Sequence, residues 1–565
     1  MIRLLDSRRL TGANLLMQRP GAVLDIAVSE EDRNLLVAAW ERHAKWLLHD
    51  LEWEGEELAT RCFDGGVSLA ISAPVDGLYT ATEVNEAAWE AARDWLEGGQ
   101  RHLLQRAARQ LRREYRDEER PRLQRLLDIA REKRVPVLLD EDVLTLGTGR
   151  FCESWDLFEL PHPEDLNWPA YKAIPSALIT GTNGKTTTVR LLASIAKAAN
   201  TTAGVSSTDW LAIGDELLDR DDYAGPGGAR LVLRDKRCEL AILETARGGI
   251  LRRGLAVERA DVALITNIAA DHLGDFGVAT VDDLADVKWT VSKALDARGT
   301  LVINAEDALL TTRMANTDAK IVMFALSRKS PAFAAHIKAG GVGFCVRRGR
   351  LTKISKTDEQ SIVSVKKIPV CYAGAAVHNV ANCLAAAAVA DALNLPPESI
   401  AAGLIALSNE SNPGRANVFT INGGSVLVDF AHNPAGLEAL MPMAKQLPAK
   451  RRALVIGQAG DRPDDDIKAF ALAAADLKFQ RIFIKRMDGH ARGRGQGDVA
   501  RLMKASFVEQ GYAAKDISIV KTELDAARSA LRWAKQGDLV LFLSHEHREK
   551  TQAFFQSRQN SSKDV

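Results

Sequence analysis

The 565-residue sequence lacks the hallmarks of several protein classes. Its six cysteines are scattered and include no C-x-x-C pair, so neither a disulfide framework nor a zinc site is indicated. No apolar run approaches the length that spans a bilayer, and the first residues lack the apolar core of a signal peptide. The 74 basic and 74 acidic residues balance, which argues against a bulk nucleic-acid or membrane-surface binder. We therefore expect a cytoplasmic protein with reduced thiols.

The length and composition are those of a multidomain globular protein. Hydrophobic residues make up 46% of the chain and charged residues 26%, which is typical of soluble folded proteins. A chain of this length is too long for one hydrophobic core, so about two to four domains are expected. No internal repeat is evident in the sequence.

Residues 1–155 predict a small α+β domain. Its expected elements are strands over 23–28 and 68–72 and a helix over 30–48. A long charged helical region follows, and its basic stretch, 106–116, has two interpretations. It either contacts an anionic polymer or forms the solvated face of an amphipathic helix, and leucines at helix-like intervals favour the second. Prolines between 161 and 169 then predict a linker over 156–172.

The remainder of the chain predicts two α/β domains. Apolar strand-like runs alternate with helical segments, and these runs are continuously apolar, as are strands buried on both faces. We therefore expect a P-loop-type, doubly wound, parallel central domain over 173–410 and a Rossmann-like C-terminal α/β domain over 411–556. The polar residues 557–565 predict a disordered tail.

The most informative segment is a glycine-rich turn between a predicted strand and a predicted helix. Residues 181–188 read GTNGKTTT, with an apolar run before them and a helix-periodic one after them. The backbone amides of such a turn and the positive end of the helix bind phosphates. Lys185 adds a full charge, and Thr186 can reach a phosphate-bound magnesium. Ile179 stands where the commoner P-loop pattern has glycine, so this is the shorter G-T-x-G-K-T form. The segment predicts ATP or GTP binding.

Further polar clusters follow the predicted strands, where nucleotide and substrate sites of open α/β sheets lie. They are 244–249 (ETARGG), 266–273 (TNIAADHL), Lys288 and 304–307 (NAED). Taken singly, each has an ordinary structural interpretation: Glu244 could cap a helix, His272 could be a loop histidine, and Lys288 could be a solvated helix lysine.

Together and in this order, these motifs resemble those of the Mur ligase family of ATP-dependent amide-bond-forming ligases. Three later segments extend the resemblance over about 173–550: 378–386 (HNVANCLAA), 413–415 (PGR) and 429–434 (DFAHNP). Within the family, the chain is most similar to the ligase half of cyanophycin synthetases. That similarity is carried by 225–235 (GPGGARLVLRD), 244–255 (ETARGGILRRGL), 412–437 and 492–494, and near the N-terminal domain by 10–15 and 146–150.

The chain also departs from the cyanophycin synthetase pattern. In those enzymes a large ATP-grasp domain, which extends the aspartate backbone, lies between the N-terminal and Mur-like parts. Here only about twenty residues separate Arg150 from Tyr171. The Mur-like part of those enzymes adds arginine to aspartate side chains. The resemblance therefore implies half a synthetase, or a ligase redirected to another carboxylate.

The resemblance assigns roles to individual residues. It implies catalytic roles for Lys185, Glu244, His272 and Lys288. It implies nucleotide contacts for Gly181, Thr182, Asn183, Gly184, Lys185, Thr186, Thr187, Asn267, Asn304, Asp307, Arg415 and Asp429. It implies magnesium ligands at Thr186, Glu244, His272 and, if it is carbamylated, Lys288, and substrate contacts for Arg247, His432 and Asn433. The two ligase domains are expected to close on each other about a hinge at 408–413.

The expected activity is amide bond formation through an acyl phosphate, with ATP and Mg²⁺. The leading expectation is a basic amino acid joined to an aspartate side chain, by a homodimer or homotetramer. Two alternatives stay open. One is a Mur-type ligase for another small acceptor, such as a dipeptide, a cell-wall precursor or a folate-like substrate. The other is a nucleotide-binding regulatory or scaffold partner of a full-length cyanophycin synthetase. A GTPase is the least favoured, because no guanine-selective motif is evident.

Overall fold

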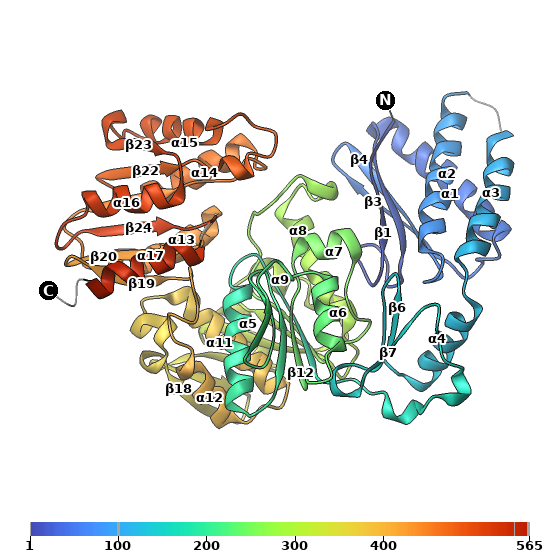
Figure 1. Ribbon diagram of the computed structural model, residues 1–565, viewed down its shortest axis with the longest axis horizontal. Helices are drawn as coiled ribbons and strands as arrows, with labels where there is room; N and C mark the ends of the chain where they lie inside the picture. Colours follow the sequence, from blue (N-terminus) through green and yellow to red (C-terminus); the bar gives the residue numbers. More distant parts are fainter. Residues whose placement is uncertain (1, 99–101, 547, 562–565) are drawn as a thin grey trace.

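The computed structural model describes residues 2–98, 102–546 and 548–561, whose strands form four sheets. Figure 1 shows an N-terminal part in blue, a central part in green and yellow, and a C-terminal part in orange and red. The mixed α/β architecture predicted from the sequence is confirmed. The site described below lies where the central and C-terminal parts meet.

The N-terminal part is a four-stranded antiparallel sheet with helices on one face (Figure 1). The sheet order is β1-β2-β4-β3, with β1 Arg3–Leu10, β2 Gly21–Ala27, β3 Leu58–Phe63 and β4 Gly66–Ser72. The apolar core of this part lies between the sheet and three helices, α1 Glu30–Asp50, α2 Leu78–Leu96 and α3 His102–Glu118. The basic stretch lies on α3, whose Leu111 is only 3% exposed, so the amphipathic interpretation holds. A separate helix, α4 Pro121–Lys133, ends the helical region.

A small antiparallel sheet joins this part to the central one. Its strands are β5 Val137–Leu139, β6 Val143–Leu146 and β7 Glu153–Asp156. Asp140, in the β5–β6 turn, forms ion pairs with Arg230 (2.7 Å) and Arg234 of helix α6 Pro226–Arg234. This contact fixes the small sheet against the central part.

The central part is an eleven-stranded sheet covered on both faces. The order is β11-β10-β9-β12-β8-β13-β14-β15-β16-β17-β18. In this spatial order, the neighbouring strands between β9 and β16 pair in parallel. The strands are β8 Ser176–Thr180, β9 Ala203–Ser206, β10 Leu211–Ile213, β11 Glu216–Asp219, β12 Leu240–Glu244, β13 Val262–Ile265, β14 Thr300–Asn304, β15 Lys320–Ser327, β16 Val342–Arg347, β17 Arg350–Ile354 and β18 Glu359–Ser364. The edge strands are antiparallel, so the prediction of a parallel sheet holds for its centre and is wrong for its two edges.

Two apolar cores sandwich this sheet, which makes it doubly wound. One face is packed by α5 Lys185–Ala198, α11 Val377–Ala392 and α12 Pro397–Ala406. The other is packed by α6, α7 Arg247–Arg253, α8 Val281–Trp289, α9 Ala308–Thr311 and α10 Pro331–Lys338. Helix α5 begins at Lys185, so the glycine-rich turn passes directly into it.

The C-terminal part is a six-stranded sheet of order β19-β20-β24-β21-β22-β23, parallel except for β19. The strands are β19 Asn417–Ile421, β20 Gly424–Asp429, β21 Arg452–Ile456, β22 Arg481–Lys485, β23 Ile517–Val520 and β24 Leu539–Leu543. Helices α13 Pro434–Gln446, α14 Asp464–Ala475 and α15 Asp498–Glu509 pack one face, and α16 Glu523–Trp533 and α17 Arg548–Ser561 the other. This arrangement agrees with the predicted Rossmann-like domain.

The end of the chain differs from its prediction. Residues 557–561, expected in a disordered tail, continue helix α17, whereas residues 562–565 lie outside the described residues. The helix is anchored by Phe555, which is fully buried and packs on Phe419 and Phe542. The polar residues 557–561 therefore extend α17, because Phe555 packs the preceding turn of that helix against the sheet. No helix among the described residues has the length and apolarity to cross a bilayer.

Candidate active site

The glycine-rich turn between β8 and α5 is built for close backbone approach. Gly181 has φ 140° and Gly184 has φ 88°, conformations that side chains disfavour. A Cβ at Gly181 would lie 1.8 Å from Thr266 Oγ1, and one at Gly184 would lie 2.2 Å from Asn382 Oδ1. Helix α5 has no side-chain cap, so its first amides remain available to an anion. This geometry fits a bound nucleotide phosphate.

Two lysines converge on this turn. Lys185 Nζ donates to the carbonyls of Gly181 and Thr182, each at 3.0 Å, and Lys288 Nζ from α8 donates to the Gly181 carbonyl at 2.9 Å. Lys288 is 3% exposed, so it is not a solvated helix lysine. Burial and the nearby Lys185 hold the pKa of Lys288 well below its ordinary value.

Glu244 ends the neighbouring strand β12 and faces the start of α5. The residue is 1% exposed, and its carboxylate accepts hydrogen bonds from Thr186 Oγ1 (3.3 Å), Ser207 Oγ (2.8 Å) and Thr208 Oγ1 (2.6 Å). One carboxylate among hydroxyls is an all-oxygen donor set, which fits Mg²⁺. In the part of the chain that the structure describes, no group of three or more His, Cys, Asp or Glu side chains is placed to hold a metal.

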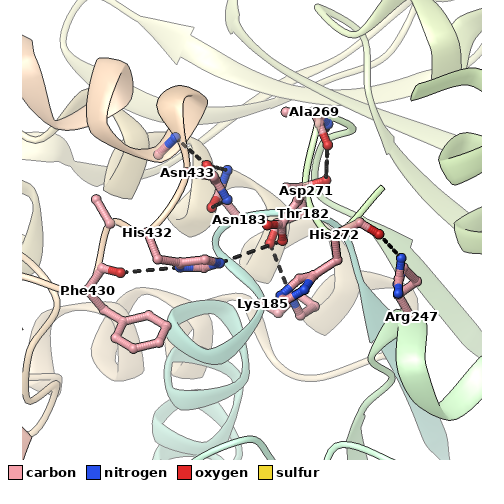
Figure 2. Close-up of polar contacts among 12 residues, drawn as sticks. Thr182, Asn183, Lys185, Arg247, Ala269, Asp271, His272, Phe430, His432 and Asn433 are labelled. Atoms are coloured by element: carbon pink, nitrogen blue, oxygen red, sulfur yellow. Dashed lines mark hydrogen bonds and ion pairs between the residues drawn. The ribbon is translucent and has the colours of Figure 1, made fainter. Parts of the chain in front are cut away.

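His272 lies in the loop after β13, with a left-handed backbone (φ 52°). Its Nε2 accepts from Arg462 at 3.2 Å, and its backbone carbonyl accepts from Arg247 of α7, as Figure 2 shows. Partial desolvation, aided by Arg462 and Arg247 and opposed by Asp271, lowers the pKa of His272 from 6.5 to about 4. The imidazole is therefore neutral near pH 7 and has a lone pair on Nε2.

This electrostatic setting gives a direct expectation for a titration by NMR. The His272 ring resonances will move with a midpoint near pH 4, because protonation would place a charge on a partly desolvated ring near the Arg462 and Arg247 guanidinium groups, although the side chain is 43% exposed. Comparing spectra of the wild type and a His272→Gln variant identifies the resonances. A midpoint near the ordinary value of 6.5 would contradict the effect of the arginine contacts on this ring.

The C-terminal part closes directly over the turn (Figure 2). The side chains of Asn183 and Asn433 exchange hydrogen bonds at 3.2 Å. Asp271 pairs with Arg462 at 2.7 Å, and His432 Nε2 lies 3.6 Å from the same carboxylate. Arg462 received no role from the sequence, although it follows strand β21 at the sheet edge where such sites lie. The two domains thus share one polar site.

We expect the contact between the two asparagines to affect nucleotide binding. An Asn433→Ser variant retains a hydroxyl that can cap α13, as Asn433 does, but is too short to reach Asn183. Losing a neutral hydrogen-bond pair should raise the KM for ATP about three- to tenfold. Steady-state ADP release from Asn433→Ser, Asn183→Ala and the double variant measures the coupling. Strictly additive effects would mean that the contact carries no binding energy.

Three predicted nucleotide contacts support the loops of the site in this structure. Asn267 Oδ1 accepts from the Asn183 amide (3.0 Å), and Asn267 Nδ2 donates to the Asn183 carbonyl (2.9 Å). Asp307 Oδ2 accepts from the Ile268 amide at 2.7 Å, and Asn304 accepts from the Glu306 amide at 3.0 Å. The motif at the end of β14 is thereby tied to the loop after β13.

Asp429 and Arg415, expected to contact the nucleotide from the C-terminal domain, are also engaged within the protein. Asp429 accepts from the Ala416 and Ala431 amides, each at 2.7 Å. The Arg415 guanidinium lies over the Phe430 ring, 4.5 Å from its centroid. Phe430 and His432 both lie in the loop that follows Asp429 at the end of β20.

Asp209 brings together arginines from both domains, and sequence reasoning missed it. It pairs with Arg190 of α5 at 3.1 Å and with Arg548 of α17, and Arg415 lies 3.8 Å away. Arg548 also lies over the Phe430 ring. Because Asp209 directly follows Thr208, which donates to Glu244, this cluster connects the domain interface to the candidate magnesium site.

Comparisons with known proteins agree with this architecture. Residues 179–390 match the Mur ligase middle domain, and residues 414–545 match the Mur ligase glutamate ligase domain. Cyanophycin synthetase from Nostoc sp. is 37% identical over 66% of this chain, and the match covers 41% of that protein's length. The chain thus spans less than half the length of this relative.

The matches to two further proteins cover a larger share of those proteins' length. The UDP-N-acetylmuramoyl-L-alanyl-D-glutamate–2,6-diaminopimelate ligase of Geobacillus kaustophilus is 28% identical over 65% of this chain and 73% of its own. The solved structure of E. coli FolC in complex with DHPP and ADP has a TM-score of 0.50 at 18% identity, covering 68% of this chain and 89% of FolC, which shows a shared fold. The chain therefore contains the middle and C-terminal domains of the Mur ligase family and belongs to that family.

Proposed function

We propose that this chain is an ATP-dependent ligase that joins an amino acid amine to a carboxylate and releases ADP and phosphate. In its finer form, the proposal is that a basic amino acid is added to an aspartate side chain, as the similarity to cyanophycin synthetase suggests. The observation that carries the proposal is the contact of the C-terminal domain with the phosphate-binding turn, through Asn433 to Asn183, and with the loop after β13, through Arg462 to Asp271.

The chemistry needs two anions to meet. A carboxylate oxygen attacks the γ-phosphorus of ATP, the bond to the bridging oxygen breaks, and ADP leaves. The amine then attacks the acyl carbon, loses a proton, and displaces phosphate, which takes the former carboxylate oxygen with it. Lys185 and the amides of α5 offset the repulsion between carboxylate and phosphate. Magnesium, when held by Glu244 and Thr186, supplies further positive charge.

Domain closure serves the second half of this reaction. An acyl phosphate hydrolyses if water reaches it before the amine does. Asn433, His432 and Arg462 of the C-terminal domain lie against the phosphate-binding turn and the loop after β13, where they limit access of water and line the path of the amine. Arg247 holds the His272 loop from the central domain.

Lys288 has a distinct place in the proposal. Its burial and lowered pKa favour the neutral amine, which is the form that reacts with carbon dioxide to give a carbamate. A carbamate at Lys288 would be an anion beside Lys185 and could act as a metal ligand. Lys185, Glu244, His272 and Lys288 are accordingly the proposed catalytic residues.

A second candidate function is ligation to another small acceptor. The 28% identity to a diaminopimelate ligase favours it, because that relative belongs to the same family and the match covers 73% of its length. The two functions differ in the acceptor and the amine. A chain that only binds nucleotide, as a partner of a full-length cyanophycin synthetase, is the outcome if no pair of substrates reacts.

An ADP-release screen separates these functions. Individual amino acids are combined with aspartate-backbone oligomers, simple dipeptides, a cell-wall precursor or a folate, and each product is identified by mass. The proposal expects ADP release with an aspartate oligomer and a basic amino acid, with a mass gain of that amino acid less water. Release only with another acceptor would favour the second candidate, and release without any ligated product would contradict both.

A further inference from the structure

The loop that carries Asp271 and His272 has an unusual backbone. Within residues 271–280, four residues have left-handed φ values: His272 at 52°, Gly274 at 102°, Phe276 at 53° and Gly277 at 68°. Two are glycines, but a bulky aromatic residue such as Phe276 rarely adopts this conformation. Such a backbone persists where the surrounding structure holds it. The question is which residues hold this loop.

Part of the support comes from the N-terminal sheet. Arg61, on β3, donates from Nη1 to the Gly277 carbonyl at 3.1 Å, and its Nη2 pairs with Asp283 at 2.5 Å. Asp283 forms the capping box that starts α8, the helix that carries Lys288. The ring of Phe63, two residues along β3, lies against Gly277 so closely that a Cβ there would be 2.5 Å from it. One N-terminal strand therefore contacts both the end of the loop and the start of α8.

A second strand supports the aromatic residue of the loop. Arg8, on β1, places its guanidinium over the Phe276 ring, 4.6 Å from the centroid. Arg8 is itself held by Asp25 at 2.6 Å and by the Leu251 carbonyl of α7 at 2.9 Å. Its side chain is 10% exposed, so its position is set by these partners. The loop is thus held from the N-terminal side at Phe276 and Gly277.

The N-terminal part is also joined to the central domain by backbone hydrogen bonds at the end of α7. The Thr11 amide donates to the Arg253 carbonyl, and the Leu255 amide donates to the Ala13 carbonyl, both at 2.7 Å. A Cβ on Gly12 would lie 2.2 Å from the Leu255 carbonyl oxygen, so the two backbones touch. These contacts follow α7, whose Arg247 holds the other side of the loop at His272 and Asp275.

We propose that Arg61 is a positioning residue of the ligase site, and that with Phe63 and Arg8 it gives the N-terminal domain a role in catalysis. These side chains hold loop 271–280 in the conformation that presents His272 and Asp271 to Arg462 and to the bound nucleotide. The consequence for turnover rests on the proposed function. The positioning itself does not, because it is a property of the loop.

Hydrogen–deuterium exchange of loop 271–280 tests the positioning directly. Arg61→Ala removes one hydrogen bond to a carbonyl and one ion pair, and we expect about tenfold faster exchange in the loop. Arg19→Ala is the matched control, because Arg19 makes the same two kinds of contact within the N-terminal part, to the Gly55 carbonyl (2.7 Å) and Glu56 (2.6 Å). Equal loop exchange in Arg61→Ala and Arg19→Ala would overturn the proposal. If Arg61→Ala does not fold, Phe63→Ala and Arg61→Lys carry the same comparison.

Kinetics separate positioning from general stability. Arg61→Ala should lower kcat/KM for Mg-ATP about tenfold and shift the magnesium dependence to higher concentration, Arg61→Lys should recover part of the loss, and Arg19→Ala should leave both unchanged. A faster-exchanging loop with unchanged kinetics would overturn the catalytic role. If the wild type ligates no substrate pair, the proposed function fails, while the exchange comparison still decides whether Arg61 positions the loop.

Discussion

A Lys185→Ala variant will release ADP about a thousandfold more slowly than the wild type at saturating substrates. Lys185 is the first residue of α5 and the cation of the phosphate-binding turn, where charge builds up as the carboxylate meets the γ-phosphate. Removing one preorganised charge-stabilising group of this kind costs about 4 kcal/mol of barrier. The measurement is the initial rate of ADP release with the substrate pair found by the screen.

The same variant should fold normally. Among the described residues, Lys185 Nζ hydrogen-bonds to two carbonyls of its own turn and forms no ion pair, so its loss leaves no buried anion without a partner. Lys197→Ala is the matched control on the same helix, because Lys197 pairs on the surface with Asp215. Its rate should equal that of the wild type. A Lys185→Ala rate within tenfold of the wild type would remove the turn from the catalytic account.

Glu244→Gln should lower the rate by a few hundredfold and raise the magnesium concentration needed for half-maximal rate. The amide has nearly the same shape but no charge, and its nitrogen cannot accept from the Ser207 or Thr208 hydroxyls. Glu244 is the carboxylate that contacts Thr186 and Thr208, so the variant would remove an anionic protein ligand from the candidate metal site. A magnesium titration of ADP release measures both effects.

Glu239→Gln is the control for this variant. Glu239 lies just before β12, at the opposite end of the strand from Glu244, and pairs on the surface with Arg150 at 2.9 Å. Its magnesium dependence should match that of the wild type. If Glu244→Gln also keeps the wild-type dependence, Glu244 is a structural acceptor for the surrounding hydroxyls and another group holds the metal.

The sequence predicted the strands in which every residue is buried. Strands such as β12 and β13 are continuously apolar and buried on both faces, so their pattern could be recognised without tertiary information. The edge strands β10 and β11 were missed. β10 is buried but only three residues long, too short for a recognisable pattern, and all four residues of β11 are exposed, so packing leaves no pattern there.

The site was predictable where its residues follow neighbouring strands. The turn after β8 and Glu244 at the end of β12 lie together because these parallel strands are adjacent in the sheet. Arg462 and Asp209 could not be found in this way. Arg462 pairs with Asp271 and Asp209 pairs with Arg548, and both contacts depend on how the two domains close. The contact of Arg61 with Gly277 joins residues far apart in sequence and leaves no local signal.

Oxygen transfer from the acceptor to phosphate tests the central claim most directly. An aspartate oligomer labelled with ¹⁸O in its carboxylates is incubated with ATP, a basic amino acid and the enzyme, and the released phosphate is analysed by mass. If the γ-phosphate goes to the carboxylate, each phosphate released during ligation carries one labelled oxygen. Unlabelled phosphate would mean that water accepts the γ-phosphate, and would contradict the assignment of this chain as an acyl-phosphate ligase acting on that acceptor.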